Sequence, residues 1–167
     1  PVYSVEGCEG PQYSSAIVVP RDSGLDLSTL ASRTFAYNSR SSLSGYRAMR
    51  SMFGEPEGFF AKIIRSGGHR NSARMVADGK AEVAAIDAVC WDILQKFETE
   101  TSDKLRVVGW TAKRPSLPMI TSLNTSDKTV HLLRKILNTV SHMPEAHALG
   151  ITDFVEVPIS DYHVLSL

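Results

Sequence analysis

The stretch SGGHRNSARMVADGKAEVAAIDAVCWD, residues 66–92, reads as a glycine turn, an amphipathic helix, a buried strand and a second helix. The apolar run at residues 82–86 is typical of a strand that is covered on both faces of a sheet. His69 stands at the start of the first helix, and Asp87 stands at the end of the strand. Open α/β proteins bind ligands at these two kinds of position. The stretch therefore predicts a polar binding site in an α/β protein.

The rest of the chain continues the alternation of strands and helices. Strands are predicted at residues 13–20, 33–38, 61–65, 82–86, 105–111, 119–122 and 154–157, and helices at residues 45–53, 70–77, 89–97, 127–142 and 161–165. Strands that alternate with helices indicate an α/β fold with mostly parallel pairing. Residues 125–127 supply an N-cap for the longest helix, which carries a regular apolar stripe.

The length, composition and charge of the chain argue against several classes of protein. With 167 residues, of which 43% are hydrophobic, the chain is long enough for one domain with a core or for two small lobes. The 18 basic and 18 acidic residues balance, which argues against a nucleic-acid partner or a broad membrane-binding patch. Cys8 and Cys90 are too few for a disulfide framework, so both are expected to be free.

Another predicted helix with polar residues at its N-terminus lies upstream of residues 66–92. Residues 41–46, SSLSGY, place Ser42 and Ser44 before a predicted helix. Their hydroxyls, with the backbone N–H groups of Ser44, Gly45 and Tyr46, could hold the oxygens of an anion at the positive end of the helix dipole. The alternative is that these serines are ordinary N-caps. Two such helix starts facing one cleft would favour a binding protein over an enzyme.

Neither a nucleophile nor a metal site is predicted. Cys90 could be a nucleophile with His69 and Asp87 as partners, but a nearby carboxylate raises a thiol pKa and opposes activation. We therefore expect Cys90 to be a small buried hydrophobe. The remaining histidines show no zinc-ligand spacing with cysteine or with each other, namely His131, His142, His147 and His163. No catalytic residue, metal or cofactor is expected.

Several of these segments together resemble a known family. SGGH followed by ADGKAEVAAID and a tryptophan, and then VVGWTAKRPSLPMITS, resembles the phosphate, phosphite and phosphonate substrate-binding proteins of ABC transporters. The resemblance extends upstream through YSSAIVV and FAYNSRSSLSGY, and it covers most of residues 13–122 in order. It implies the type 2 periplasmic binding-protein fold, in which two α/β lobes are joined by crossing strands and the ligand binds between them.

The resemblance also implies where the two lobes begin and end. The crossing strands would be residues 34–38 and 107–111, lobe 2 would be residues 39–111, and lobe 1 would combine residues 1–38 with residues 112–167. Members of the family carry a further N-terminal segment, so lobe 1 is expected to be incomplete here. An incomplete lobe would expose apolar surface and free strand edges, which predicts self-association or a retained N-terminal fragment.

The ligand implied by the resemblance is a phosphorus oxyanion: phosphate, phosphite or an alkyl phosphonate. The residues that would bind it are Tyr13, Ser42, Leu43, Ser44, Gly45, His69 and Asp87. Leu43 stands where the family commonly has a hydroxyl residue, so it keeps a backbone donor and removes a side-chain donor. Asp87 would accept a hydrogen bond from a protonated ligand oxygen and would repel sulfate. Alternatively, these two residues have structural roles: Asp87 would be the N-cap of the following helix, and His69 would be a surface residue in a turn.

The resemblance thus implies the solute-binding component of an ABC importer, which would work with a membrane permease in the periplasm or another extracytoplasmic space. This chain itself shows no signal-peptide pattern. One alternative is the effector-binding domain of a transcription regulator with the same fold. Another is a binding protein for a sulfonate or a thiamine precursor. An enzyme is a third class, for which the sequence offers no competent nucleophile and base.

Overall fold

The computed structural model describes the backbone of residues 1–165 and the side chains of residues 1–162. The chain divides into two compact units, which are described separately below. Unit 1 combines Pro1–Tyr13 with Arg114–Leu167, and unit 2 is Ser14–Lys113. The chain therefore passes between the units twice, after Tyr13 and after Lys113. Within the described residues, no helix is long and apolar enough to cross a membrane.

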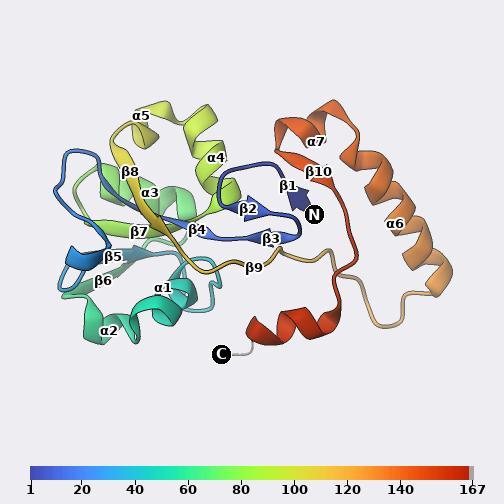
Figure 1. Cartoon of the computed structure of the whole chain (residues 1–167), viewed down its shortest axis with the longest axis horizontal. Helices are drawn as coiled ribbons and strands as arrows, with labels where there is room; N and C mark the ends of the chain where they lie inside the picture. The colour runs from blue at the N-terminus through green and yellow to red at the C-terminus, as the bar shows by residue number, and fades with distance from the viewer. Residues whose placement is uncertain (166–167) are drawn as a thin grey trace. The chain divides into compact units, whose positions relative to one another are not determined.

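Unit 2 is built on a five-stranded sheet with the order β6-β5-β7-β4-β8 (Figure 1). The strands are β4 (Ser15–Pro20), β5 (Thr34–Tyr37), β6 (Lys62–Arg65), β7 (Val83–Asp87) and β8 (Leu105–Trp110). β5 pairs in parallel with β6 and with β7, whereas β4 is antiparallel to both of its neighbours. The expectation of mostly parallel pairing is therefore wrong. A helical crossover precedes β6 and β7 and makes them parallel to β5, but no helix precedes β4 in unit 2.

Helices cover both faces of this sheet. They are η1 (Leu27–Thr29), α1 (Tyr46–Phe53), α2 (Pro56–Phe59), α3 (His69–Ala77), α4 (Ala88–Phe97) and α5 (Thr99–Ser102). One hydrophobic cluster joins the sheet to α3 and α4, and the other joins it to α1 and to Phe60, which follows α2. Along β7, Val83 and Ala85 belong to one cluster while Ala84 and Ile86 belong to the other. This alternation confirms the prediction that the strand is covered on both faces.

Unit 1 contains two small antiparallel sheets, β1-β10 and β2-β3-β9 (Figure 1). Its elements are β1 (Val2–Tyr3), β2 (Cys8–Glu9), β3 (Gln12–Tyr13), β9 (Arg114–Pro115), α6 (Asp127–Ser141), α7 (Pro144–Ala148), β10 (Ile151–Asp153) and η2 (Ile159–Leu165). Ser126 is the N-cap of α6 and accepts from the Thr129 N–H, as predicted.

Two of the predicted strands do not form. Residues 119–122 and 154–157 have no regular secondary structure, and β10 ends just before the second of them. A strand needs a partner for its ladder as well as suitable residues, and neither segment has one among the described residues. The short strands β1 and β2 were not expected from the sequence, because two residues carry no recognisable period.

The division between the units also differs from the expected one. β5 was expected to cross between the lobes, but it lies inside the sheet of unit 2, between β6 and β7. Residues 14–33 were expected in lobe 1, yet β4 pairs with β7 and β8 and therefore belongs to unit 2. The strand pairing of residues 14–38 is long-range, and local sequence patterns do not reveal it.

Candidate functional site

The candidate site lies at one edge of the sheet in unit 2. Because β5, β6 and β7 are parallel, their carboxyl ends meet at the same edge. The N-termini of α1, α3 and α4 follow these strands at that edge (Figure 1). Helix N-termini carry unpaired N–H groups and a partial positive charge, so the edge is suited to an anion. We call the cluster of Asn38, Ser44, His69 and Asp87 at this edge the strand-end site.

His69, the first residue of α3, is the centre of this cluster. Its Nε2 atom lies 2.8 Å from the Ser44 hydroxyl and 3.2 Å from the amide nitrogen of Asn38. Its Nδ1 atom lies 3.2 Å from the carbonyl oxygen of Ala85 on β7. The backbone N–H of Asp87 is 3.4 Å from the same Nδ1 atom. The structure therefore brings together groups from α3, from the loop before α1 and from the ends of β5 and β7.

These hydrogen bonds define the protonation of the ring. The Oδ1 atom of Asn38 accepts a hydrogen bond from the Ser39 N–H at 3.0 Å, so its amide NH₂ group faces His69. An amide NH₂ group only donates, so Nε2 accepts from Asn38, and the proton lies on Nδ1, where it is donated to the Ala85 carbonyl. With this tautomer the Asp87 N–H, at 3.4 Å, is a neighbour of Nδ1 and does not donate to it. Burial lowers the pKa of His69, while the charge of Asp87 and the hydrogen bond to Ala85 oppose this effect. In this arrangement the ring is neutral.

The lowered pKa of His69 predicts that acidification destabilises the fold. Below the ordinary histidine pKa of about 6.5, the unfolded chain takes up a proton before the folded chain does. The free energy of unfolding should therefore fall as the pH drops through 6.5, by at most about 1.4 kcal/mol per pH unit for one proton. Urea unfolding at pH 7.5 and pH 5.5 measures this. A His69→Gln variant should lose less stability than the wild type over this range, and an equal loss would contradict the prediction.

The loop at residues 42–45 approaches the end of β5 closely. The Ser42 hydroxyl accepts from the Gly45 N–H at 3.1 Å, which forms a tight turn before α1. A Cβ atom at Gly45 would lie 2.1 Å from Oδ1 of Asn38, so only glycine fits there. Gly45 is the N-cap of α1, and no side chain caps this helix. Ser44 therefore does not have the capping role expected as the alternative, and its hydroxyl contacts His69 instead. Leu43 is half-buried in the same loop.

Asp87 is the N-cap of α4, which confirms the structural role expected as one alternative. Its Oδ1 atom accepts from the N–H groups of Val89, at 3.0 Å, and Cys90, at 3.3 Å. Both capping bonds use Oδ1, so Oδ2 remains outside the cap. Capping and ligand binding can therefore be combined in this one side chain, because a carboxylate has acceptor sites on both oxygens.

Cys90 is not activated. Burial raises the pKa of its thiol to about 11, and the charge of Asp87 adds to this effect. A thiol with such a pKa is protonated near neutral pH and is a poor nucleophile. Cys90 is a free thiol, as expected. Among the described side chains, no three histidine, cysteine or acidic groups come together to hold a metal ion. The side chain of His163 lies outside the described residues.

Several other aromatic and polar side chains of unit 2 have structural partners. Trp91 is buried in the core, and Trp110 packs against the same cluster. The Thr111 hydroxyl accepts from the Ser15 N–H at 2.9 Å and joins the start of β4 to the end of β8. Arg70 and Arg74 both pair with Glu98, so they belong to a charged surface. Tyr13 is buried in β3 of unit 1, whereas the other predicted site residues are all in unit 2.

Sequence reasoning missed two polar residues of this edge. Asn38 directly follows β5, and this position after a strand is the signal that could have identified it. Ser15 lies opposite Asp87 in the β4–β7 register. Its buried Oγ atom has no hydrogen-bond partner among the described residues. Nothing in the local sequence marks Ser15, because its neighbour on β7 is 72 positions away.

The chain has the α/β fold of the type 2 periplasmic binding proteins. The chain matches the family described as "ABC transporter, phosphonate, periplasmic substrate-binding protein" over residues 3–162. The chain therefore belongs to the family of phosphonate periplasmic substrate-binding proteins of ABC transporters. Its members are substrate-binding proteins and not enzymes, and they act in an extracytoplasmic space. No curated protein sequence matches the chain.

Solved structures of similar fold include several binding proteins. XAC2383 from Xanthomonas citri bound to ATP is 22% identical with a TM-score of 0.67, over 99% of this chain and 68% of that one. A binding-protein component of an ABC phosphonate transporter, PA3383 from Pseudomonas aeruginosa, is 21% identical with a TM-score of 0.71, over 91% of this chain and 54% of that one. PhnD1 from Prochlorococcus marinus in complex with methylphosphonate is 23% identical with a TM-score of 0.56, over 63% and 43% of the two chains. At these identities the likeness shows the fold alone.

Proposed function

We propose that this chain is the solute-binding component of an ABC importer and that it binds a phosphorus oxyanion: phosphate, phosphite or an alkyl phosphonate. The observation that carries the proposal is the strand-end site. Ser44, Asn38 and His69 are joined by hydrogen bonds at an edge where three helices begin. Hydroxyl and N–H donors at helix N-termini suit phosphoryl oxygens. Membership of the family supports the solute-binding role.

Each proposed ligand contact has its own chemistry. The Ser42 and Ser44 hydroxyls and the N–H groups of the loop would donate to the anion, and Leu43 would contribute its backbone N–H. Gly45 allows the loop to approach Asn38 closely. On binding an anion, the Ser44 hydroxyl would turn from His69 to the ligand, and a protonated His69 would become a second donor. The resemblance alone supports Tyr13 as a contact.

Asp87 gives this site its proposed preference among anions. Its Oδ2 atom lies outside the cap of α4 and could accept a hydrogen bond from a protonated phosphoryl oxygen. Sulfate carries no proton near neutral pH, so the Asp87 carboxylate would repel its negatively charged oxygen. The proposed partner of the loaded protein is a membrane permease, and the proposed location is periplasmic or otherwise extracytoplasmic. The protonated thiol of Cys90 supports a role without covalent chemistry.

Calorimetric titration with phosphate, methylphosphonate and sulfate at equal ionic strength and pH 7 tests this proposal. We expect phosphate or methylphosphonate to bind at least tenfold more tightly than sulfate. A Ser44→Ala variant should lose about 10- to 150-fold in affinity, because a hydrogen bond to a charged group contributes about 1.5–3 kcal/mol. Ser51→Ala, on the exposed side of α1, is the matched control and should bind like the wild type. Equal affinity for sulfate and phosphate would refute the role of Asp87, and full affinity in Ser44→Ala would refute the site.

A further inference from the structure

Ser15 brings a buried hydroxyl without a partner to the edge of the sheet that carries the strand-end site. It is the first residue of β4 and is only 1% exposed. Its Oγ atom makes no hydrogen bond with any described residue. A buried hydroxyl without a partner destabilises a fold, so native proteins seldom retain one that has no further role. The missing partner of Ser15 is therefore sought in the ligand.

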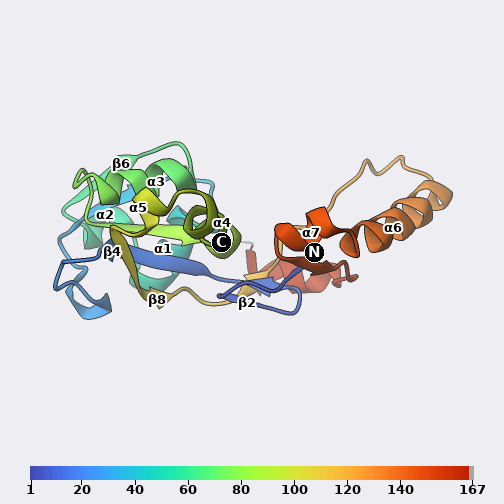
Figure 2. The same ribbon diagram turned by 90° about the horizontal axis from the view of Figure 1, so that it is seen from above.

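The strand register places this hydroxyl beside Asp87. β4 is antiparallel to β7, and Ser15 lies directly opposite Asp87. The Ser15 N–H donates to the Thr111 hydroxyl at 2.9 Å, and the Ser15 carbonyl accepts from the Thr111 N–H at 3.0 Å. Both backbone groups of Ser15 therefore point away from β7, toward the side of β4 on which β8 lies (Figure 2). Ser15 and Asp87 thus form a non-hydrogen-bonded pair, the kind in which opposed side chains come closest.

Both side chains belong to the face of the sheet that α1 covers. Side chains alternate between the two faces along a strand. Ile17, two residues after Ser15, and Ala85, two residues before Asp87, both pack in the hydrophobic cluster that includes α1. Ser15 and Asp87 are in phase with these two residues. They therefore share the face whose helix is preceded by the loop at residues 42–45.

This pair of residues offers one donor and one acceptor to a ligand. Both capping bonds of Asp87 go to Oδ1, which leaves Oδ2 as an acceptor. The Ser15 hydroxyl has a proton that it donates to no described residue. A ligand hydroxyl can donate to Oδ2 of Asp87 and accept from Oγ of Ser15 at the same time. An oxygen without a proton satisfies only the serine and is repelled by the carboxylate, so the pair selects a protonated oxygen.

We infer that Ser15 and Asp87 together bind the hydroxyl of a singly protonated phosphoryl group, with Ser15 as the donor to its oxygen and Asp87 as the acceptor of its proton. The inference rests on the proposed function and adds Ser15 as a residue that determines specificity. It narrows the ligand to an oxyanion that keeps a P–OH group when it binds, such as hydrogen phosphate or the monoanion of methylphosphonate. The Ser15 hydroxyl has no partner in the free protein because its partner arrives with the ligand.

A Ser15→Ala variant separates this role from a structural one. Removing a hydroxyl that has no partner should leave the melting temperature of the free protein equal to or above that of the wild type. Calorimetric titration at pH 7 should show about tenfold weaker phosphate binding, because one hydrogen bond to an anion is lost. Ser102→Ala is the matched control, since Ser102 is also buried and its hydroxyl donates to the Thr99 carbonyl within α5. This control should bind phosphate like the wild type.

A double-mutant cycle with Asp87→Asn tests whether the two side chains bind the same ligand hydroxyl. Asparagine is also a good N-cap, so α4 keeps its cap while the charged acceptor is lost. Ser15→Ala should then weaken phosphate binding by less than about threefold in the Asp87→Asn background, against about tenfold in the wild type. Equal losses in both backgrounds, or unchanged affinity in Ser15→Ala, would overturn the inference and leave the proposed function in place. A wild-type chain that binds neither phosphate nor methylphosphonate would refute the proposed function, and the inference with it.

Discussion

A Gly45→Ala variant is expected to lose at least tenfold in affinity for phosphate or methylphosphonate, together with about 1–3 kcal/mol of unfolding free energy. The added Cβ atom would lie 2.1 Å from Oδ1 of Asn38 and 2.9 Å from its Cγ, so the loop or the amide must move. Asn38 in turn faces Nε2 of His69, and the Ser44 hydroxyl shares that atom. One methyl group therefore displaces three of the groups that form the strand-end site.

The control for this substitution is Gly24→Ala. A Cβ atom at Gly24 would have no heavy atom within 4 Å, and the residue does not require a positive φ, so alanine should be neutral there. Urea unfolding and calorimetric titration with phosphate measure the two effects. Adding Asn38→Ala to Gly45→Ala should recover part of the lost stability by removing the clash, which gives a measurable coupling between the two positions. Wild-type affinity and stability in Gly45→Ala would show that the loop tolerates the methyl group.

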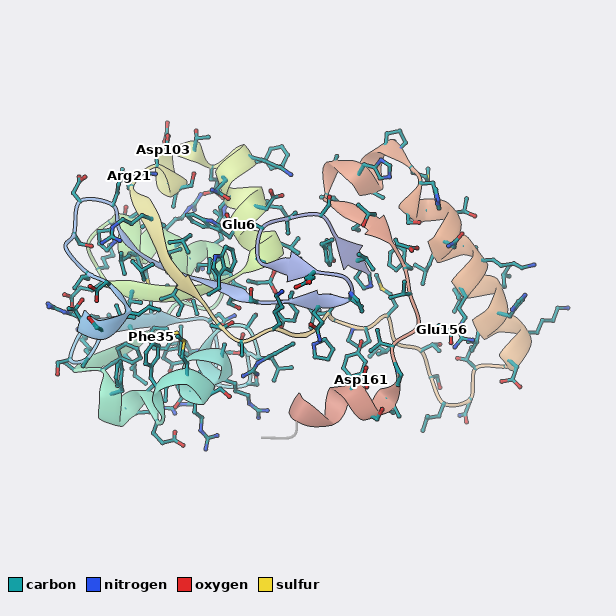
Figure 3. The ribbon with its side chains drawn as sticks, viewed as in Figure 1. Glu6, Arg21, Phe35, Asp103, Glu156 and Asp161 are labelled. Atoms are coloured by element: carbon teal, nitrogen blue, oxygen red, sulfur yellow. The ribbon has the colours of Figure 1, made fainter. Side chains whose placement is uncertain are left out.

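A Phe35→Ala variant should lose about 3–5 kcal/mol of unfolding free energy, the largest stability effect that we predict. Phe35, labelled in Figure 3, is fully buried in β5. Its ring stacks on that of Phe60 at a centroid distance of 4.8 Å and lies 6.1 Å from the ring of Tyr37. Truncation leaves a cavity between the sheet and the segment after α2, and a parallel strand held on both sides cannot move to fill it.

Phe97→Ala is the control for this truncation. Phe97 is the last residue of α4 and is 71% exposed, so the same change of side chain should alter the free energy of unfolding by less than about 0.5 kcal/mol. Denaturant unfolding of both variants shows how much of the lost free energy of unfolding is due to the burial of the side chain and how much to the change of residue type. A loss below about 1.5 kcal/mol in Phe35→Ala would mean that the core of unit 2 repacks around the missing ring, contrary to the close packing described above.

The sequence by itself determined the five strands and the three longer helices of unit 2, and it pointed to three residues of the strand-end site. Amphipathic periods and glycine turns located α1, α3 and α4, because those patterns follow from helix geometry and act over a few residues. The continuous apolar run at residues 82–86 predicted a strand covered on both faces, and the structure confirms it. His69, Ser44 and Asp87 were identified by their positions at strand ends and helix starts. The resemblance to phosphonate-binding proteins, carried by the same residues, agrees with the family match.

Only the tertiary structure decided which strands pair and how the polar groups are joined. The antiparallel insertion of β4 between β7 and β8 brings together residues that are far apart in the sequence, such as Ser15 and Asp87, and no local pattern encodes such a contact. For the same reason Ser15 was missed and the tautomer of His69 could not be inferred, whereas Asn38 was overlooked although its position after β5 marks it. In unit 1, residues 119–122 and 154–157 have strand sequence but no strand, because a ladder forms only where a partner exists. Local preference selects the kind of element that a segment can form, and long-range contact determines whether the segment forms it.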